Sequence, residues 1–271
     1  MQPHCLIVIP ARYASTRFPG KPLIPIAGRP MIQHVYERAC QARLADSVVV
    51  ATDDRRIADV VSGFGGQAEM TASDHPSGTD RVAEVATRRD CDLVVNVQGD
   101  EPCIAPQAID AMIQPLRDDP GVQITTLAHV LTDPAALLTP NVVKVVVDRH
   151  NNALYFSRAP IPYYREGWQQ TPSAVNPASP EPSIPPGCYR HLGLYAYRRQ
   201  VLLEFARLAP TPLEQVEQLE QLRALEHGYR LRVVPTTYSS IGVDTPEDVA
   251  AAERVLRQDA ANTKGNQHAN A

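Results

Sequence analysis

Short apolar runs alternate with segments of helical periodicity along the first 130 residues of the chain. The runs are rich in Val, Ile and Leu at consecutive positions, which is typical of strands that are covered on both faces. The segments between them repeat apolar residues at helical spacing. The predicted strands span residues 5–9, 47–51, 67–70, 93–97 and 123–130, and the predicted helices span 31–43, 55–64, 79–88 and 108–116. This alternation predicts an α/β fold with a mostly parallel, doubly wound sheet.

The pattern changes after residue 140, where the regular alternation of strands and helices is interrupted. Strands are predicted at 142–148, 153–157, 189–197 and 231–235, and helices at 200–207, 213–227 and 246–257. Residues 165–187 contain six prolines, which predicts an exposed loop. We therefore interpret residues 1–258 as a single α/β domain in which residues 140–200 form an inserted arm. Residues 259–271 are polar and are predicted to be a disordered tail.

The strand predicted at 189–197 separates polar from apolar side chains. Because side chains alternate along a strand, His191 and Tyr195 point to one face and Leu192 and Leu194 to the other. A single histidine is more often structural than functional. The pairing of His191 with Tyr195 on one polar face makes a role in ligand binding the alternative interpretation.

The helix predicted at 213–227 carries an apolar stripe that should face the core. The stripe consists of Leu213, Val216, Leu219, Leu222 and Leu225. Glu220 lies at the edge of this stripe, where a carboxylate needs a partner. That partner is either a cation in a salt bridge or a hydroxyl group of a ligand.

Composition and charge exclude several classes of protein. Hydrophobic residues make up 44% and charged residues 21% of the 271 residues, as in ordinary globular domains. The formal net charge of −4 argues against a general nucleic-acid binder but allows a local basic pocket. No apolar run reaches the length of a membrane span. The five cysteines are scattered without metal-ligand spacing, so we expect reduced thiols in a cytoplasmic protein.

The loop after the first predicted strand concentrates positive charge. It contains Arg12, Ser15 and Lys21, and lysine is scarce in this chain. In an open parallel sheet, ligands bind beyond the carboxyl ends of the strands. Guanidinium, ammonium and backbone N–H groups at this place suit a polyphosphate. The spacing matches neither the ATPase phosphate loop nor the dinucleotide fingerprint, and a solvated surface loop is the alternative.

Asp100 follows the strand predicted at 93–97 and therefore lies at the same edge of the sheet. Carboxylates at such an edge suit Mg²⁺, which binds through one or two carboxylates together with substrate phosphates. The alternative is a turn that starts the next helix.

Asp244 stands directly before the predicted C-terminal helix. Thr245 as the N-cap, Pro246 at the first helical position and Asp248 at the third form a capping box. Capping leaves Asp244 unexplained, so it is either a second metal ligand or a turn residue.

Six motifs occur together and in order, and in combination they resemble the 3-deoxy-manno-octulosonate cytidylyltransferase family, the CMP-Kdo synthetases of Gram-negative bacteria. They are PARYASTRFPGKPL at 10–23, SGTDR at 77–81, NVQGDEP at 96–102, YFSR at 155–158, RHLG at 190–193 and VDTPED at 243–248. The resemblance covers residues 4–257. It departs from the family at Asp80, where glutamate is usual, in the longer proline-rich stretch and in the tail.

The resemblance implies the fold of nucleotide-diphospho-sugar transferases with a dimerisation arm, and the reaction of CTP with 3-deoxy-D-manno-octulosonate (Kdo) to give CMP-Kdo and pyrophosphate for lipopolysaccharide. The implied partners are these two substrates and a second copy of the chain, with no nucleic acid or membrane. The implied residues are Arg12, Ser15 and Lys21 for the CTP phosphates, Ser77, Gly78 and Arg81 for cytosine, Asp100 and Asp244 for Mg²⁺, and Gln98, Arg158, His191, Tyr195, Glu220 and Gln221 for the sugar acid.

The implied chemistry is an in-line attack of the anomeric hydroxyl on the α-phosphorus, without a covalent enzyme intermediate. Catalysis then consists of positioning and charge neutralisation, for which Arg12, Lys21, Asp100 and Asp244 are the expected residues. Three alternatives stay open: a related enzyme such as CMP-sialate synthetase, a non-catalytic nucleotide-binding module, and a metal-dependent glycosyltransferase that uses Asp100.

Overall fold

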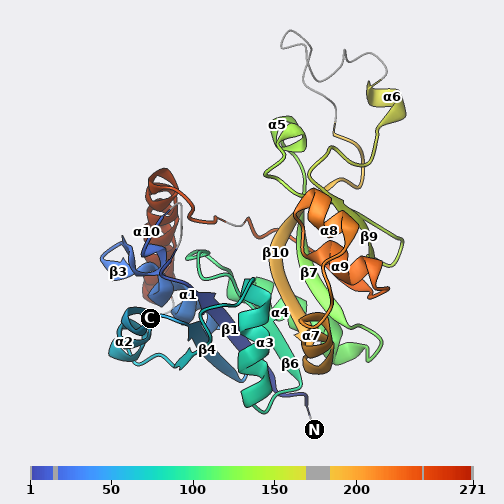
Figure 1. The fold of residues 1–271 in the computed structure, drawn as a ribbon. Helices are drawn as coiled ribbons and strands as arrows, with labels where there is room; N and C mark the ends of the chain where they lie inside the picture. Colours follow the sequence, from blue (N-terminus) through green and yellow to red (C-terminus); the bar gives the residue numbers. More distant parts are fainter. Residues whose placement is uncertain (1, 15–17, 169–183, 240, 270–271) are drawn as a thin grey trace.

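The computed structural model describes residues 2–14, 18–168, 184–239 and 241–269. Within these ranges, nine strands form one mixed sheet in the order β11-β7-β10-β6-β1-β4-β5, to which β8 and β9 attach at β10 (Figure 1). The strands are β1 (Cys5–Ala11), β4 (Ser47–Thr52), β5 (Ala68–Met70), β6 (Leu93–Asn96), β7 (Ile124–Val130), β8 (Lys144–Val147), β9 (Ala153–Ser157), β10 (Tyr189–Arg198) and β11 (Leu231–Thr236). A separate small hairpin joins β2 (Pro25–Ile26) to β3 (Arg29–Pro30).

The predicted parallel sheet is confirmed for most of the strands. Strands β6, β1, β4 and β5 are parallel, and β11 is parallel to β7. Strand β10 is antiparallel to both β6 and β7, which the sequence pattern did not indicate. Tyr189 at the start of β10 pairs with Val130 at the end of β7. Because the inserted arm returns the chain at this carboxyl edge, β10 can only run back through the sheet in the opposite direction.

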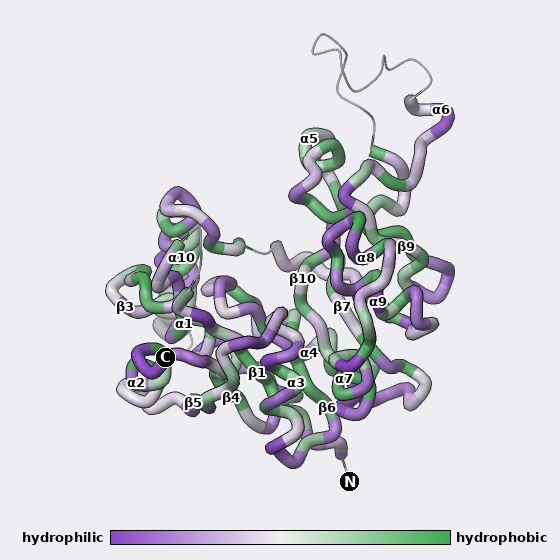
Figure 2. The backbone as a smooth tube through the Cα atoms, in the orientation of Figure 1, coloured by the Kyte–Doolittle hydropathy of each residue, from purple (hydrophilic) through white to green (hydrophobic). Residues whose placement is uncertain are grey.

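Helices cover both faces of the sheet, as the doubly wound prediction requires. They are α1 (Met31–Ala39), α2 (Arg55–Gly63), α3 (Gly78–Arg88), α4 (Pro106–Asp118), α5 (Pro134–Leu138), α6 (Arg165–Trp168), α7 (Arg199–Phe205), α8 (Pro212–Glu217), α9 (Gln221–Glu226), α10 (Pro246–Ala269) and the 3₁₀ turn η1 (Lys21–Leu23). Alternate residues of β1 enter different cores: Ile7 belongs to a cluster that includes residues of α1 and α4, whereas Val8 belongs to one that includes residues of α3 and α7. The central strands form the apolar interior (Figure 2).

The helix predicted at 213–227 is two helices, and this corrects the predicted apolar stripe. Helix α8 ends at Gln218, which adopts a left-handed conformation with φ of 53°, and α9 begins three residues later. The break rotates the first half of the segment away from the core. Leu219 and Leu222 are buried as predicted, but Leu213 and Val216 are 41% and 82% exposed.

Residues 259–269, predicted to be a disordered tail, continue helix α10 without interruption. The helix begins with the predicted capping box, in which Asp248 accepts the backbone N–H of Thr245 at 2.8 Å. Ala252 and Leu256 pack on Ile26, and Asp259 pairs with Arg38 of α1 at 3.0 Å. The ion pair anchors the first residue of the expected tail, a contact that local polarity does not indicate.

A buried lysine connects separate segments of the inserted arm. Hairpin β8–β9 pairs with the start of β10, and Figure 1 shows α5 and α6 beyond this end of the sheet. The ammonium of Lys144 is fully buried and donates to the carbonyls of Thr139, Val142 and Arg158 at 3.1, 2.7 and 2.6 Å. Of the predicted loop at 165–187, residues 169–183 lie outside the described residues, and Arg165–Trp168 is helical.

No helix within the described ranges combines the length and the apolar character that crossing a membrane requires.

Candidate active site

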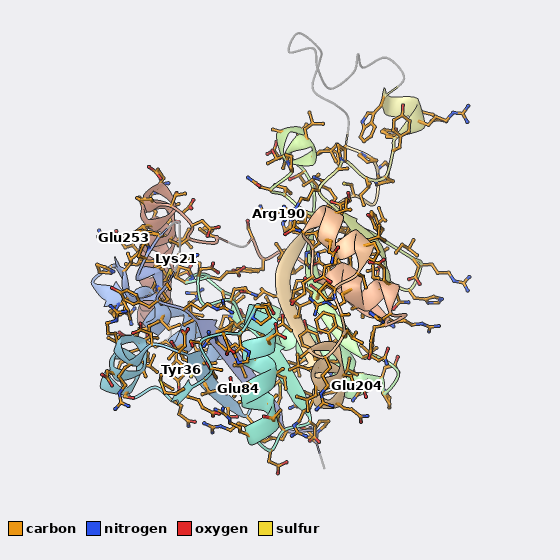
Figure 3. The ribbon with its side chains drawn as sticks, in the orientation of Figure 1. Lys21, Tyr36, Glu84, Arg190, Glu204 and Glu253 are labelled. Atoms are coloured by element: carbon orange, nitrogen blue, oxygen red, sulfur yellow. The ribbon has the colours of Figure 1, made fainter. Side chains whose placement is uncertain are left out.

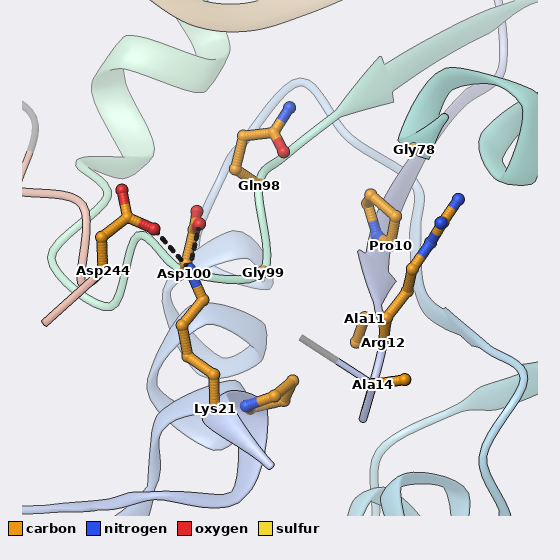
Figure 4. Close-up of a pocket in the computed structure, with 11 residues that line it drawn as sticks. Pro10, Ala11, Arg12, Ala14, Lys21, Gly78, Gln98, Gly99, Asp100 and Asp244 are labelled. Atoms are coloured by element: carbon orange, nitrogen blue, oxygen red, sulfur yellow. Dashed lines mark hydrogen bonds and ion pairs between the residues drawn. The ribbon is translucent and has the colours of Figure 1, made fainter. Parts of the chain in front are cut away.

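A pocket of about 410 Å³ opens at the carboxyl edge of the sheet, between the ends of β1 and β6 (Figure 4). It is lined by Pro10, Ala11, Arg12, Ala14, Lys21, Pro22, Gly78, Gln98, Gly99, Asp100 and Asp244. Several of these are predicted site residues from four separate segments of the chain. The structure therefore brings together the charged loop, the start of α3 and both candidate metal ligands.

Gly99 allows the loop after β6 to approach β1 closely. A Cβ atom at this position would lie 2.7 Å from the carbonyl oxygen of Pro10, so the close approach excludes a side chain. The backbone N–H of Val97 donates to Val8 at 3.1 Å and continues the pairing of β6 with β1. This contact places Asp100 directly beside the loop that follows β1.

Lys21 contacts both candidate metal ligands. Its Nζ atom lies 2.7 Å from Oδ2 of Asp100 and 3.0 Å from Oδ1 of Asp244 (Figure 4). The backbone supports the same arrangement, because the N–H of Val243 donates to the carbonyl of Asp100 at 2.9 Å. Figure 3 shows Lys21 close to α10, the helix that follows Asp244.

The charges at this point raise the pKa of Lys21. Burial alone lowers the pKa of the ammonium, but the charges and hydrogen bonds of Asp100 and Asp244 outweigh burial and raise it above its ordinary value. Lys21 is therefore a permanent cation at neutral pH.

The donor set fits a magnesium ion. Oxygens of Asp100 and Asp244 converge on one ammonium group, so they also converge on a position that a cation can occupy. The described residues contain no group of three or more His, Cys, Asp and Glu side chains that could enclose a metal ion. Two carboxylates in an open pocket are the protein contribution that Mg²⁺ uses when water and substrate phosphates complete its shell.

The predicted nucleotide-binding residues divide into those at the pocket and those behind it. Arg12 lines the pocket, and its Nη2 donates to the carbonyls of His75 and Ser77 at 2.6 and 2.9 Å. Ser77 is the N-cap of α3, where its Oγ accepts the N–H of Asp80 at 3.2 Å. Arg12 and Ser77 thus hold the loop before α3 in place. Ser15 lies outside the described residues.

Arg81, predicted to recognise cytosine, is not among the residues that line the pocket. Its side chain is fully buried, with Nη1 donating to Thr71 and Nη2 3.3 Å from a carboxylate oxygen of Asp53. In this structure Arg81 therefore contacts the loop that follows β4, and its role toward cytosine stays a prediction.

His191 and Tyr195 share one face of β10 as predicted, with ring centroids 5.6 Å apart. Nε2 of His191 lies 2.8 Å from Oγ1 of Thr126, which itself donates to the carbonyl of Leu194 at 2.8 Å. Because a hydroxyl has one proton, Nε2 is the donor in the first contact. Burial lowers the pKa of His191 to about 3, so the ring is neutral at physiological pH.

Two further predicted residues for the sugar acid contact backbone groups. Nε2 of Gln98 donates to the carbonyl of Gly193 at 3.2 Å and so joins the pocket to β10. Arg158 donates to the carbonyls of Pro140, Glu217 and Gln218 at 3.1, 2.7 and 3.2 Å. The guanidinium of Arg158 therefore connects the arm to the end of α8 in this structure.

Glu220 and Gln221 lie at the start of α9, near Tyr195. Glu220 accepts a hydrogen bond of 2.5 Å from the hydroxyl of Thr79 in α3, and its other oxygen lies 3.8 Å from Arg223. Gln221 is buried, and its Nε2 atom has no hydrogen-bond partner among the described residues. A buried amide without a partner is a place where a ligand oxygen would be accommodated.

Sequence reasoning missed the residues that position the others. Thr79 and Glu217 are the clearest cases, since Glu217 accepts hydrogen bonds from Ser157 at 2.6 Å and from the backbone of Arg158 at 2.9 Å. Thr79 belongs to the SGTDR motif, but its partner Glu220 is 141 residues away in the sequence. No local pattern identifies such a pair.

The chain is similar to known proteins over most of its length. A profile of the family described as Cytidylyltransferase matches residues 6–232. The 3-deoxy-manno-octulosonate cytidylyltransferase of Pelobacter propionicus is 56% identical over 253 residues, which cover 92% of this chain and 96% of that protein. That of Syntrophotalea carbinolica is 59% identical over 250 residues, with coverage of 92% and 97%. A solved structure of CMP:2-keto-3-deoxy-manno-octonic acid synthetase complexed with CTP superimposes with a TM-score of 0.84 at 44% identity, and covers 94% of this chain and 99% of that one.

Proposed function

The chain belongs to the 3-deoxy-manno-octulosonate cytidylyltransferase family, and we propose that it transfers CMP from CTP to the anomeric hydroxyl of Kdo and releases pyrophosphate. The observation that carries this proposal is the convergence of Lys21, Asp100 and Asp244 in one pocket at the carboxyl edge of the sheet. A triphosphate needs positive charge there, and a divalent cation needs carboxylates there. The product is an activated sugar acid for lipopolysaccharide.

The chain itself contributes binding and charge neutralisation. Asp100 and Asp244 would hold Mg²⁺, which when bound would neutralise charge on the phosphates and make the attacking hydroxyl more acidic. Lys21 neutralises charge on the departing pyrophosphate, and Arg12 keeps the loop before α3 in position at the same pocket. The anomeric hydroxyl of Kdo attacks the α-phosphorus, its bond to phosphorus forms as the α,β-bridging bond breaks, and its proton passes to solvent.

The sugar acid is proposed to lie between the pocket and α9. Gln98 lines the pocket and contacts Gly193 in β10, so it connects the two regions. A small crevice between β10 and α9 is bordered by Tyr195, Glu220 and Gln221. Carboxylate and amide groups of this kind bind sugar hydroxyls, whereas Arg158 would meet the substrate carboxylate only after leaving its present carbonyl partners.

A homodimer and a cytoplasmic location complete the proposal. Large apolar side chains are exposed on and near the arm, including Leu138, Leu154 and Tyr163 at 46%, 62% and 70%. An exposed apolar surface of this kind suits contact with a second copy of the chain. All five cysteines are free thiols, as is usual in a reducing compartment. Sedimentation analysis at micromolar concentration tests the dimer, which a purely monomeric protein would contradict.

Pyrophosphate release tests the activity directly. The protein is incubated with Mg²⁺, one nucleotide (CTP, UTP or ATP) and one acceptor (Kdo, sialic acid or none). We expect release with CTP and Kdo and at least tenfold less with either alternative acceptor or nucleotide. Preference for sialic acid would replace Kdo as the substrate. Binding of CTP without any turnover would indicate a nucleotide-binding module instead and would contradict the proposal.

A further inference from the structure

Lys21 occupies the point at which the two candidate metal ligands meet. We propose that Lys21 is the resident counter-ion of this site in the free protein, that it is exchanged for the divalent cation when nucleotide phosphates attract its ammonium group, and that metal and nucleotide therefore bind together. The proposal rests on the proposed function, because it takes a nucleoside triphosphate and a divalent cation as ligands. Its new element is the competition between Lys21 and the metal for the same two carboxylates.

The first argument is electrostatic. Oxygens of Asp100 and Asp244 lie 2.7 and 3.0 Å from the same nitrogen atom, so the two carboxylates are held within reach of each other. Two carboxylates at such a separation repel each other unless a cation lies between them. The ammonium of Lys21 supplies that cation before any ligand arrives.

The second argument is that the backbone at both carboxylate residues is held by contacts that do not involve Lys21. The N–H of Val243 bonds to the carbonyl of Asp100 at 2.9 Å, and the N–H of Asp244 bonds to Asp248 at 3.0 Å. Gly99 fixes the loop of Asp100 against β1 from the other side. The backbone therefore preserves the pair of ligands when Lys21 leaves, and a cation can take its place.

The third argument is a contrast with Lys144. The ammonium of Lys144 is fully buried among three backbone carbonyls and is not among the residues that line the pocket of Lys21, so it is a fixed structural cation. The side chain of Lys21 is 15% exposed, those of Asp100 and Asp244 are 33% and 61% exposed, and all three line the pocket. Ligands can therefore reach the ion pairs of Lys21 and exchange with them.

Exchange predicts reciprocal coupling. While Lys21 is bound to the carboxylates, a metal ion must displace it and binds weakly. When triphosphate oxygens take over the ammonium, the carboxylates are released for the metal. By linkage, the metal must then strengthen nucleotide binding by the same factor.

Binding of Mn²⁺, followed by electron paramagnetic resonance of the free ion, tests the exchange without turnover. Wild type, Lys21→Met and the surface control Arg29→Met are titrated without nucleotide, and then with CTP in the absence of any sugar acid. We expect Lys21→Met to bind Mn²⁺ roughly tenfold more tightly than wild type without nucleotide. We expect CTP to tighten Mn²⁺ binding strongly in wild type and Arg29→Met, and much less in Lys21→Met.

A double variant tests whether the carboxylate of Asp100 is the ligand that Lys21 releases to the metal. Lys21→Met combined with Asp100→Asn should lose the gained Mn²⁺ affinity, and circular dichroism should show that both variants are folded. Equal Mn²⁺ affinity of wild type and Lys21→Met without nucleotide would overturn the exchange, and so would a gain that survives the loss of Asp100. If pyrophosphate is released but this affinity is unchanged, the exchange fails and the proposed function stands. If Lys21→Met changes the affinity for Mn²⁺ but no acceptor reacts, the exchange stands and the proposed function fails.

Discussion

The two halves of the sheet treat their polar side chains differently. In the half formed by β1, β4 and β6, charged groups converge on an open pocket, where Lys21 pairs with the carboxylates of Asp100 and Asp244. In the half formed by β8, β9 and β10, the cations Lys144 and Arg158 are bound to backbone carbonyls. The first half is preorganised for charged ligands, whereas in the second half the cations stabilise the inserted arm.

This difference follows from topology. Parallel strands end at one edge, so the loops after β1 and β6 meet there. The arm is an insertion whose hairpin has few neighbours within the sheet, since β9 pairs only with β8 among the described strands. Lys144 and Arg158, which donate to several backbone carbonyls each, provide the missing connections. Substitutions in the two halves should therefore have opposite signatures: activity is lost in the first and stability in the second.

The largest effect is expected from Asp100→Asn or Asp244→Asn. Either change removes a charge at the proposed metal site while keeping the side-chain volume. Loss of one such electrostatic contact typically costs at least 10²–10³-fold in turnover. Pyrophosphate release from CTP and Kdo measures the loss, and urea unfolding should show little change. Normal turnover in either variant would show that the pocket is not the place of reaction. The two halves would then no longer differ in their effect on activity.

The next effect is on stability, from Lys144→Met. Methionine fills a similar volume but leaves the carbonyls of Thr139, Val142 and Arg158 without their donor. Orphaned buried carbonyls cost about 1–3 kcal/mol each, partly offset because a buried charge is also removed, so we expect a net loss of roughly 2–5 kcal/mol. Urea unfolding measures it, with Arg29→Met on the surface as the control. A loss below 1 kcal/mol would show that this lysine does not hold the arm.

The sequence predicts the first half better than the second. Lys21, Asp100 and Asp244 are recognisable because each stands in a loop that follows a predicted strand or precedes a predicted helix, and local pattern determines such places. The direction of β10, the break at Gln218 and the inward turn of Arg81 depend on contacts with distant segments. Periodicity reports which residues are apolar, but it carries no information on where an insertion returns the chain.

A smaller effect is expected where the halves are connected, at Thr79. Its hydroxyl donates to Glu220 at 2.5 Å and links the start of α3 to the start of α9. Thr79→Val keeps the shape and removes this donor, so Glu220 loses its fixed orientation. We expect the KM for Kdo to rise about tenfold, as for one hydrogen bond to a charged group, with the KM for CTP little changed.

Thr79→Ser is the matched control for this connection, because it retains the hydroxyl and should restore the KM for Kdo. Glu220→Gln should show the same selective effect as Thr79→Val, and the double variant should add little to either. A rise in the KM for CTP instead of Kdo would place Thr79 wholly in the nucleotide half.

The smallest effect is a pH dependence that belongs to the second half. Burial lowers the pKa of His191 to about 3, against about 6.5 in the unfolded chain. Between these values the unfolded state binds a proton that the folded state does not, so stability decreases as the pH falls below about 6.5, by up to roughly 1.4 kcal/mol per pH unit. His191→Gln removes this titration, and its unfolding free energy in urea should fall less steeply than that of wild type between pH 6.5 and 5. Above pH 7.5 the two proteins should run parallel, because His191 is neutral in both states there. Equal slopes of the unfolding free energy against pH for the two proteins at acid pH would mean that the imidazole of His191 can be protonated in the folded state. The second half would then accommodate charge as the first half does.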